Sequence, residues 1–297
     1  MDKLTVVAPA KINLSLDIVK KRKDSYHDLE MIMQSVSLYD RVLIQKKNKE
    51  GIFLKCSDRS LPDNENNLAY QAAKLLLVRY KKIKGVEIFI DKNIPVAAGL
   101  AGGSTDAAAV LRGINKLYNL GISNKNMKEM ASSIGSDVPF CLQGGTVFAR
   151  GRGTEIKQLS DLKKTFLVLV TPPVEVSTAR VYSKYDEIKP DLNVPTDKLI
   201  KMINTRNNID WKAGWKNILE YATIKITSEV ERIRRKLEEF HPKLVLMSGS
   251  GPSFFAVVEN KIEAQKIVSN WPYNQDFITV VYTIKKGYGE LQDEEDY

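Results

Sequence analysis

The chain has 297 residues, 43% of them apolar, so it is long enough for one large domain or two of ordinary size, and we expect two. It contains no run of about 18 apolar residues and no apolar stretch near its start, which argues against a membrane span or a secretory signal and predicts a cytoplasmic protein. The formal net charge of +9 suits an anionic partner, which could be nucleic acid, a membrane surface or a phosphorylated small molecule.

The first half of the chain alternates strand-like and helix-like segments. Its strand-like segments are rich in β-branched and apolar residues, and its helix-like segments repeat apolar residues at helical spacing. The predicted elements are strands over 5–19, 31–46 and 86–90 and helices over 68–79 and 104–119. We expect them to form a mixed domain over residues 1–155.

The second half begins after two glycine clusters, at 144–145 and 151–153, which predict hairpin turns and a domain boundary before residue 160. Strands and helices follow in mixed order, which favours an α+β fold over a regular doubly wound sheet. The predicted elements are strands over 166–170, 244–247, 254–258 and 278–284 and helices over 177–187, 196–205 and 215–240. We expect a C-terminal domain over 160–286 and a disordered acidic tail over 287–297.

Cysteine and histidine are too scarce for a common metal or redox site. Cys56 and Cys141 are far apart and form no C-x-x-C pair. With only His27 and His241 available, a zinc site would need several carboxylates as well.

A glycine-rich loop from Pro95 to Ser104 follows a predicted strand and opens a predicted helix. Free backbone amides and a positive helix end make such a loop a cradle for an anion. Thr105 and Asp106 add a hydroxyl and a carboxylate that could bind phosphate or Mg²⁺. The alternative is that Ser104 is an ordinary helix cap and the glycines a tight turn, and the loop alone supports both interpretations equally. The chain has neither a P-loop nor a dinucleotide fingerprint, so a nucleotide site would be of another type.

Three other segments carry polar residues in unusual settings. Residues 8–14 (APAKINL) place Lys11 and Asn13 near a strand entrance, residues 135–139 (GSDVP) place Asp137 in a turn beside a helix, and residues 248–253 (SGSGPS) form a second loop of small residues. Each has an ordinary interpretation: an exposed lysine, a capping aspartate and a connecting turn. Taken singly, each ordinary interpretation is favoured.

Together these segments resemble the GHMP small-molecule kinases. The resemblance is carried, in order, by residues 8–14 (APAKINL), 26–27 (YH), 95–108 (PVAAGLAGGSTDAA), 135–140 (GSDVPF) and 249–253 (GSGPS). It covers nearly the whole chain. It implies a two-domain GHMP kinase fold, with a ribosomal-protein-S5-domain-2-like N-terminal half and an α/β sandwich as C-terminal half.

The resemblance also implies the chemistry, which is transfer of the γ-phosphoryl group of ATP, with Mg²⁺, to a hydroxyl of a small-molecule CDP-linked substrate. Asp137 would be the base, and Lys11 beside it would stabilise the ionised carboxylate and the transferred charge. Asp106 would contact the metal only indirectly, and the other metal ligands stay unassigned. The residues implied in ATP binding are Pro95, Gly99, Leu100, Ala101, Gly102, Gly103, Ser104 and Thr105.

The acceptor side is implied by Tyr26 and His27, which would recognise a pyrimidine by its face and its edge. Tyr182 would close the stack, with Tyr185 as the alternative, and Asn13 would contact the substrate. A sister GHMP kinase for homoserine, mevalonate or a sugar would have no use for this clamp. A nucleic-acid-binding protein is the other alternative, and it is disfavoured because the basic clusters lie on different predicted elements.

Overall fold

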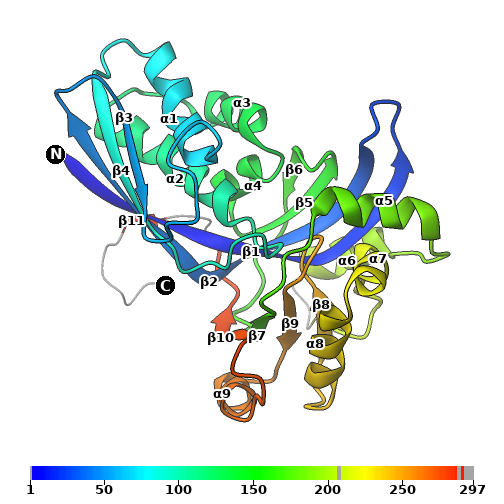
Figure 1. Ribbon diagram of the computed structural model, residues 1–297. Coiled ribbons are helices and arrows are strands. Elements are labelled where there is room, and N and C mark those ends of the chain that lie inside the picture. The colour runs from blue at the N-terminus through cyan, green and yellow to red at the C-terminus, as the bar shows by residue number, and fades with distance from the viewer. Residues whose placement is uncertain (1, 206–208, 286–288, 291–297) are drawn as a thin grey trace.

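The computed structural model describes residues 2–205, 209–285 and 289–290. Its largest sheet has seven strands and is built on a long antiparallel hairpin of β1 (Lys3–Lys21) and β2 (His27–Lys47) (Figure 1). The strand order is β11-β1-β2-β4-β3, and β5 pairs with both β2 and β6. The remaining strands are β3 (Gly51–Cys56), β4 (Gly85–Asp91), β5 (Thr146–Gly151), β6 (Glu155–Gln158) and β11 (Gly289–Glu290).

Four helices gather on one side of this sheet, above the β1–β2 hairpin in Figure 1. They are α1 (Leu68–Arg79), α2 (Gly102–Leu117), α3 (Asn124–Ile134) and α4 (Val138–Gln143). Helix α2 packs so closely that a Cβ on Gly113 would lie 2.2 Å from the Ile44 side chain of β2. The stripe predicted for α2 is buried at Val110, Leu111 and Ile114, and this burial fixes the position of the glycine-rich loop that precedes the helix.

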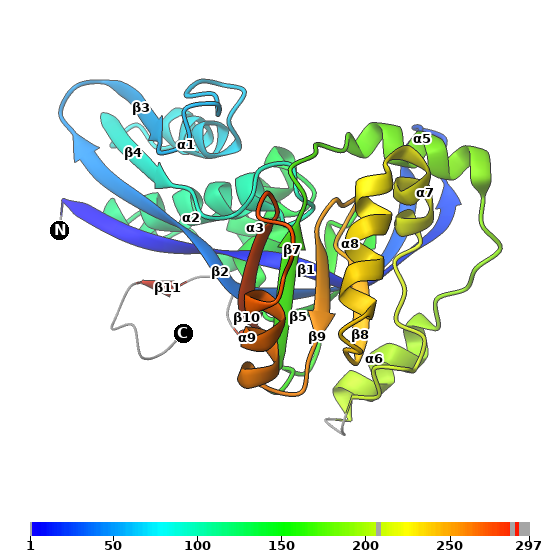
Figure 2. The same ribbon diagram turned by 60° about the horizontal axis from the view of Figure 1, so that its bottom comes forward.

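A second, four-stranded antiparallel sheet has the order β10-β7-β9-β8 and lies on the other side of the hairpin (Figures 1 and 2). Its strands are β7 (Phe166–Thr171), β8 (Leu244–Met247), β9 (Phe254–Val257) and β10 (Phe277–Tyr282). Its helices are α5 (Thr178–Ile188), α6 (Thr196–Asn204), α7 (Leu219–Ile226), α8 (Ser228–Glu238) and α9 (Lys261–Ser269).

The middle of β1 belongs to both halves of the molecule. Ala10, Ile12 and Leu14 are fully buried and pack in a core cluster with Leu169 of β7 and Phe255 of β9. This stretch of β1 is therefore sealed by apolar residues from the small sheet, and any polar side chain within it must find a partner.

The structure corrects one predicted helix and adds elements that were not predicted. Residues 215–240 form two helices rather than one. Thr227 is extended (φ −147°, ψ 129°), and its hydroxyl caps α8 by accepting a hydrogen bond from the Glu229 backbone amide. Helices α3, α4 and α9 and the short strands β3, β5 and β6 were not among the predicted elements. Most of the tail over 287–297 lies outside the described residues, but Gly289–Glu290 pairs with Val6 and Val7.

Candidate active site

The glycine-rich loop ends at a helix start whose amides are free. Ala101 occupies the N-cap of α2 in the left-handed conformation (φ 60°) and provides no side-chain cap. The first helical hydrogen bond runs from the Thr105 amide to the Ala101 carbonyl (2.9 Å), so the amides of Gly102, Gly103 and Ser104 precede the hydrogen-bonded part of the helix. Ser104 is therefore not the helix cap, so that part of the ordinary interpretation of the loop is wrong. Free amides at a helix start favour an anion.

Lys11 and Asn13 lie on β1 where its pairing with β2 is irregular, with register shifts between Pro9 and Lys11 and between Asn13 and Ser15. Such bulges redirect side chains next to functional sites. The Lys11 amide donates to the Leu100 carbonyl (3.1 Å), which joins β1 to the glycine-rich loop. The Lys11 side chain is only 4% exposed, and its Nζ donates to Asn13 Oδ1 at 2.6 Å. The expectation of an ordinary exposed lysine is wrong.

Asp137 faces Lys11 from another element. It occupies the N-cap of α4, but its side chain makes no capping hydrogen bond. Its Oδ2 instead lies 3.7 Å from Lys11 Nζ, and its side chain is 31% exposed. A carboxylate that is partly open to a cavity and paired with a buried ammonium is suited to receive a proton from a bound hydroxyl.

The second loop of small residues docks against the first. Ser248 Oγ donates to the Gly99 carbonyl (2.9 Å) and accepts from the Asn13 amide (3.3 Å). A Cβ on Gly99 would lie 2.2 Å from the Ser248 carbonyl oxygen, and the φ of Gly99 is +76°. Only glycine fits this approach. Asn217 supports the second loop by donating to the carbonyls of Met247 and Gly249.

Aromatic residues gather at the far end of the β1–β2 hairpin. The rings of His27 and Tyr182 are stacked, with centroids 5.1 Å apart, and Tyr185 meets His27 edge-on at 6.1 Å. His27 Nε2 lies 2.8 Å from Asp186 Oδ1. Tyr26 is 53% exposed and lies in the turn that precedes β2. Helix α5 thus brings Tyr182 and Asp186 to the residues of the hairpin.

Asp186 is held as a carboxylate at this end of the site. Partial burial opposes its ionisation, but hydrogen bonds from Lys21 and His27 outweigh the burial and leave the pKa of Asp186 below its usual value. The pKa of the Tyr182 hydroxyl is raised, mainly by burial. Asp186 can therefore orient the imidazole of His27 at neutral pH.

One cavity of about 850 Å³ connects these groups. Of the residues predicted for the site, Lys11, Asn13, Tyr26, His27, Gly99, Ala101, Ser104, Asp137 and Tyr182 line it. Pro95, Leu100, Gly102, Gly103 and Thr105 lie outside its lining, as does the alternative aromatic Tyr185. Leu100 and Thr105 are buried, at 0% and 1% exposed, so neither presents its side chain to the cavity.

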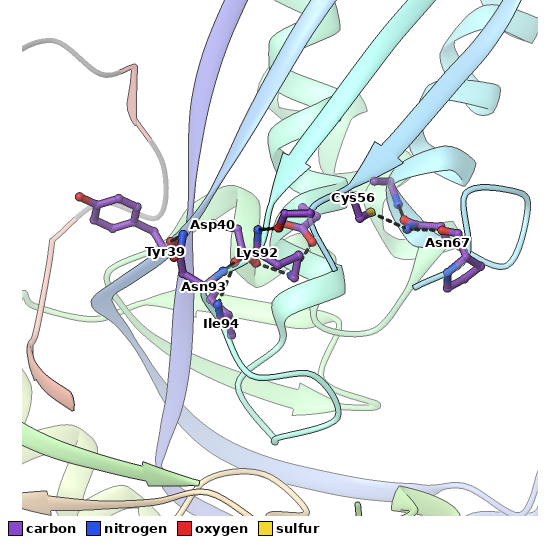
Figure 3. A network of polar contacts seen from close by, with 11 residues as sticks. Tyr39, Asp40, Cys56, Asn67, Lys92, Asn93 and Ile94 are labelled. Carbon is purple, nitrogen blue, oxygen red and sulfur yellow. Dashed lines mark hydrogen bonds and ion pairs between the residues drawn. The ribbon is translucent and has the colours of Figure 1, made fainter. Parts of the chain in front are cut away.

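A buried ionic cluster behind the glycine-rich loop was not predicted from the sequence. Lys92 Nζ donates to Oδ2 of both Asp40 and Asp106, at 2.8 Å for Asp106. Asp40 Oδ1 accepts from the amides of Asn93 (2.6 Å) and Ile94 (2.8 Å), as Figure 3 shows. The cluster therefore ties β2, the start of the loop and helix α2 together. Asp40 lies 52 positions from Lys92, and no local pattern links them.

Asp106 is unusual within this cluster. Its Oδ1 is buried and has no hydrogen-bond partner among the residues that the structure describes. Burial raises the pKa of Asp106, and the attraction of Lys92 only partly offsets the increase. Its Oδ2 accepts a hydrogen bond from Lys92, and the indirect metal contact considered for Asp106 stays a prediction. In residues 2–205, 209–285 and 289–290, no group of three or more His, Cys, Asp or Glu side chains could hold a metal ion.

Known proteins resemble the chain throughout its length. The family model described as "GHMP kinases N terminal domain" matches residues 67–145, and the model described as "GHMP kinases C terminal" matches residues 198–275. The 4-diphosphocytidyl-2-C-methyl-D-erythritol kinase of Bacillus pumilus (strain SAFR-032) is 42% identical over 278 residues, which cover 94% of this chain and 95% of that protein. The kinase of the same name from Bacillus subtilis (strain 168) is 43% identical over 281 residues, 94% of this chain and 95% of its own. The chain belongs to the GHMP kinase family.

Solved structures agree with this family. A crystal structure of 4-(cytidine 5'-diphospho)-2C-methyl-D-erythritol kinase has a TM-score of 0.79 and 30% identity, and the match covers 94% of this chain and 99% of that one. Homoserine kinase from Cytophaga hutchinsonii shares the fold at 20% identity, with a TM-score of 0.75 and 97% of both chains covered.

Membership of the GHMP kinase family confirms the predicted α+β fold of two GHMP kinase domains and the predicted enzyme class. The protein is a small-molecule kinase, and ATP is its phosphoryl donor. The domain boundaries and the roles of single residues stay predictions. No helix among the described residues is long and apolar enough to cross a membrane.

Proposed function

We propose that this GHMP kinase transfers the γ-phosphoryl group of ATP to the 2-hydroxyl of 4-diphosphocytidyl-2-C-methyl-D-erythritol, a step of non-mevalonate isoprenoid precursor biosynthesis. One observation carries the choice of acceptor: the Tyr26, His27 and Tyr182 rings line the same cavity as Lys11 and Asp137. The CDP-linked acceptor carries a pyrimidine at one end and a hydroxyl at the other. The pyrimidine would bind at the aromatic rings, and the hydroxyl would bind at the Lys11–Asp137 ion pair. The names of the Bacillus relatives support the same acceptor.

At the reaction centre, Asp137 acts as the general base. Its Oδ2 takes the proton of the acceptor hydroxyl as the oxygen attacks the γ-phosphorus in line with the leaving ADP oxygen. Lys11 Nζ is held by Asn13 Oδ1 at 2.6 Å, and its ammonium faces the phosphoryl oxygens as charge develops on them. Because Lys11 is buried, this attraction is screened less than it would be at the surface.

On the donor side, the free amides at the start of α2 bind the ATP phosphates, and Gly103 allows close approach because a Cβ there would meet only the Leu68 side chain, at 3.8 Å. Mg²⁺ bound with ATP would neutralise part of the charge of the phosphates. Ser104 lines the cavity, and its hydroxyl would be the group of this chain to hold the ion.

An assay of ATP consumption tests this function directly. The purified protein is given 4-diphosphocytidyl-2-C-methyl-D-erythritol or, in parallel, homoserine, mevalonate and a panel of sugars. We expect turnover with the CDP-linked acceptor at least about 10²-fold above the panel in kcat/KM, since a site that pairs with a polar base edge rejects acceptors lacking it. Turnover of a panel member alone would contradict the acceptor. RNA binding that ATP does not displace, without kinase activity, would favour the nucleic-acid alternative.

Tyr26→Ala is expected to weaken binding of the CDP-linked acceptor by about 5- to 150-fold, because a base–aromatic stack contributes about 1–3 kcal/mol. The KM for ATP should not change, since Tyr26 lies in the turn between β1 and β2 and not on the glycine-rich loop or α2. Tyr26→Phe keeps the ring and serves as the matched control. An acceptor KM that is equal in both variants and in the wild type would remove Tyr26 from the clamp.

A further inference from the structure

Arg152 is a cavity residue without a role in the function described so far. It lies in the turn between β5 and β6, and it lines the cavity together with Tyr26. Its guanidinium carbon lies over the Tyr26 ring, 3.9 Å from the centroid. Such a contact gains only about 0.5–1 kcal/mol at an exposed site, so the guanidinium can leave the ring at small cost.

The charges on the cavity wall single out this arginine. Of the residues that the structure describes, three cations line the cavity, Lys11, Lys21 and Arg152, against two carboxylates, Asp137 and Asp186. Lys11 is paired with Asp137, and Lys21 is paired with Asp186. Among the described residues, Arg152 has no carboxylate of its own.

Asp24, a carboxylate outside the cavity wall, interacts with the Arg152 charge, but it is already bound by Arg22. Hydrogen bonds from Arg22, at 3.1 and 3.2 Å from its Nε, are the main reason that the pKa of Asp24 is lowered, and the attraction of Arg152 contributes least. Arg152 therefore carries the positive charge that the two carboxylates of the cavity wall do not balance.

We propose that Arg152 binds the diphosphate of the CDP-linked acceptor and thereby makes the site specific for a nucleoside diphosphate over a bare nucleoside. This inference rests on the proposed function. The diphosphate joins the base to the reacting alcohol, so it must cross the cavity between the rings and Lys11. A planar guanidinium pairs with phosphate oxygens through two parallel hydrogen bonds. When the pyrimidine covers Tyr26, Arg152 moves from the ring to the phosphates next to it.

Calorimetric titration with CDP, CMP and cytidine tests the proposal on the full chain. Arg152→Ala should weaken CDP binding about 10-fold or more, CMP less, and cytidine by no more than about 2-fold. Arg152→Lys should recover part of the loss, because it restores the charge without the paired geometry. Arg150→Ala is the matched control: Arg150 lies on β5, two residues before Arg152, pairs with Glu30 at 3.0 Å and is not among the residues that line the cavity.

The outcomes separate this inference from the proposed function. An equal loss for cytidine and CDP in Arg152→Ala would show that the guanidinium only supports the stack and would overturn the proposal. Unchanged CDP affinity, with the wild type active on the CDP-linked acceptor, would overturn it while the proposed function stands. A wild type that binds neither CDP nor cytidine would overturn both, and this is seen before any variant is made. In turnover assays, support requires a raised KM for the acceptor and an unchanged KM for ATP.

Discussion

Asp137→Ala is expected to lower kcat by about 10²-fold or more, the usual contribution of a positioned general base. ATP affinity should stay unchanged, because the amides at the start of α2 do not depend on this side chain. Folding should also be preserved, since the Asp137 side chain is 31% exposed and caps no helix. Single-turnover kinetics with the CDP-linked acceptor and calorimetric titration with ATP separate the two effects.

Asp58→Ala controls for loss of a carboxylate away from the cavity, because the Asp58 side chain accepts hydrogen bonds from Ser60 and is not among the residues that line the cavity. Its kcat should match the wild type. If kcat of Asp137→Ala fell less than about 10-fold, below the range for general-base catalysis, another group would have to accept the proton.

Lys92→Ala should be the most destabilising single change behind the ATP loop, lowering the free energy of unfolding by about 3–5 kcal/mol. It removes the shared cation from Asp40 and Asp106 and leaves two buried carboxylates facing each other. Urea denaturation measures the loss. The matched control is Lys47→Ala. Lys47 Nζ lies 2.7 Å from Oε2 of Glu87 at the protein surface, so this change should lower the free energy of unfolding by no more than about 1 kcal/mol.

The Lys92→Ala variant should also respond to pH in a defined direction. Burial raises the folded-state pKa of Asp106, so the folded protein binds this proton more tightly than the unfolded chain. A raised carboxyl pKa destabilises the fold as pH increases through the interval between the unfolded and folded pKa values. Without Lys92 the pKa is raised further. The deficit relative to the wild type should therefore shrink from about pH 8 to about pH 5, and a constant deficit would contradict this account of the cluster.

The elements with strong periodicity were predicted well. Helix α1 and strands β4 and β7 agree with the prediction to within a residue or two. One apolar face of α1 and of β4 packs against a core, and β7 is a short apolar run that is buried on both faces. Short elements were missed. Helix α4 has six residues, too few for a periodic pattern, and it is stabilised by burial of Val138 and Phe140 instead. The break at Thr227 was also missed, since a single capping threonine between two helical segments gives a weak local signal.

The sequence by itself determined the family, because five ordered segments of unusual composition identify GHMP kinases without any coordinates. It also determined which residues are candidates, including Lys11, Asp137 and Tyr26. Only the tertiary structure decided which candidates meet. A bulge in β1 and the start of α4 bring Lys11 Nζ within 3.7 Å of Asp137 Oδ2. Tyr182 rather than Tyr185 lines the cavity, and Asp106 binds Lys92. The physical reason is that these contacts join distant segments, whereas local sequence patterns report only which face of an element is apolar.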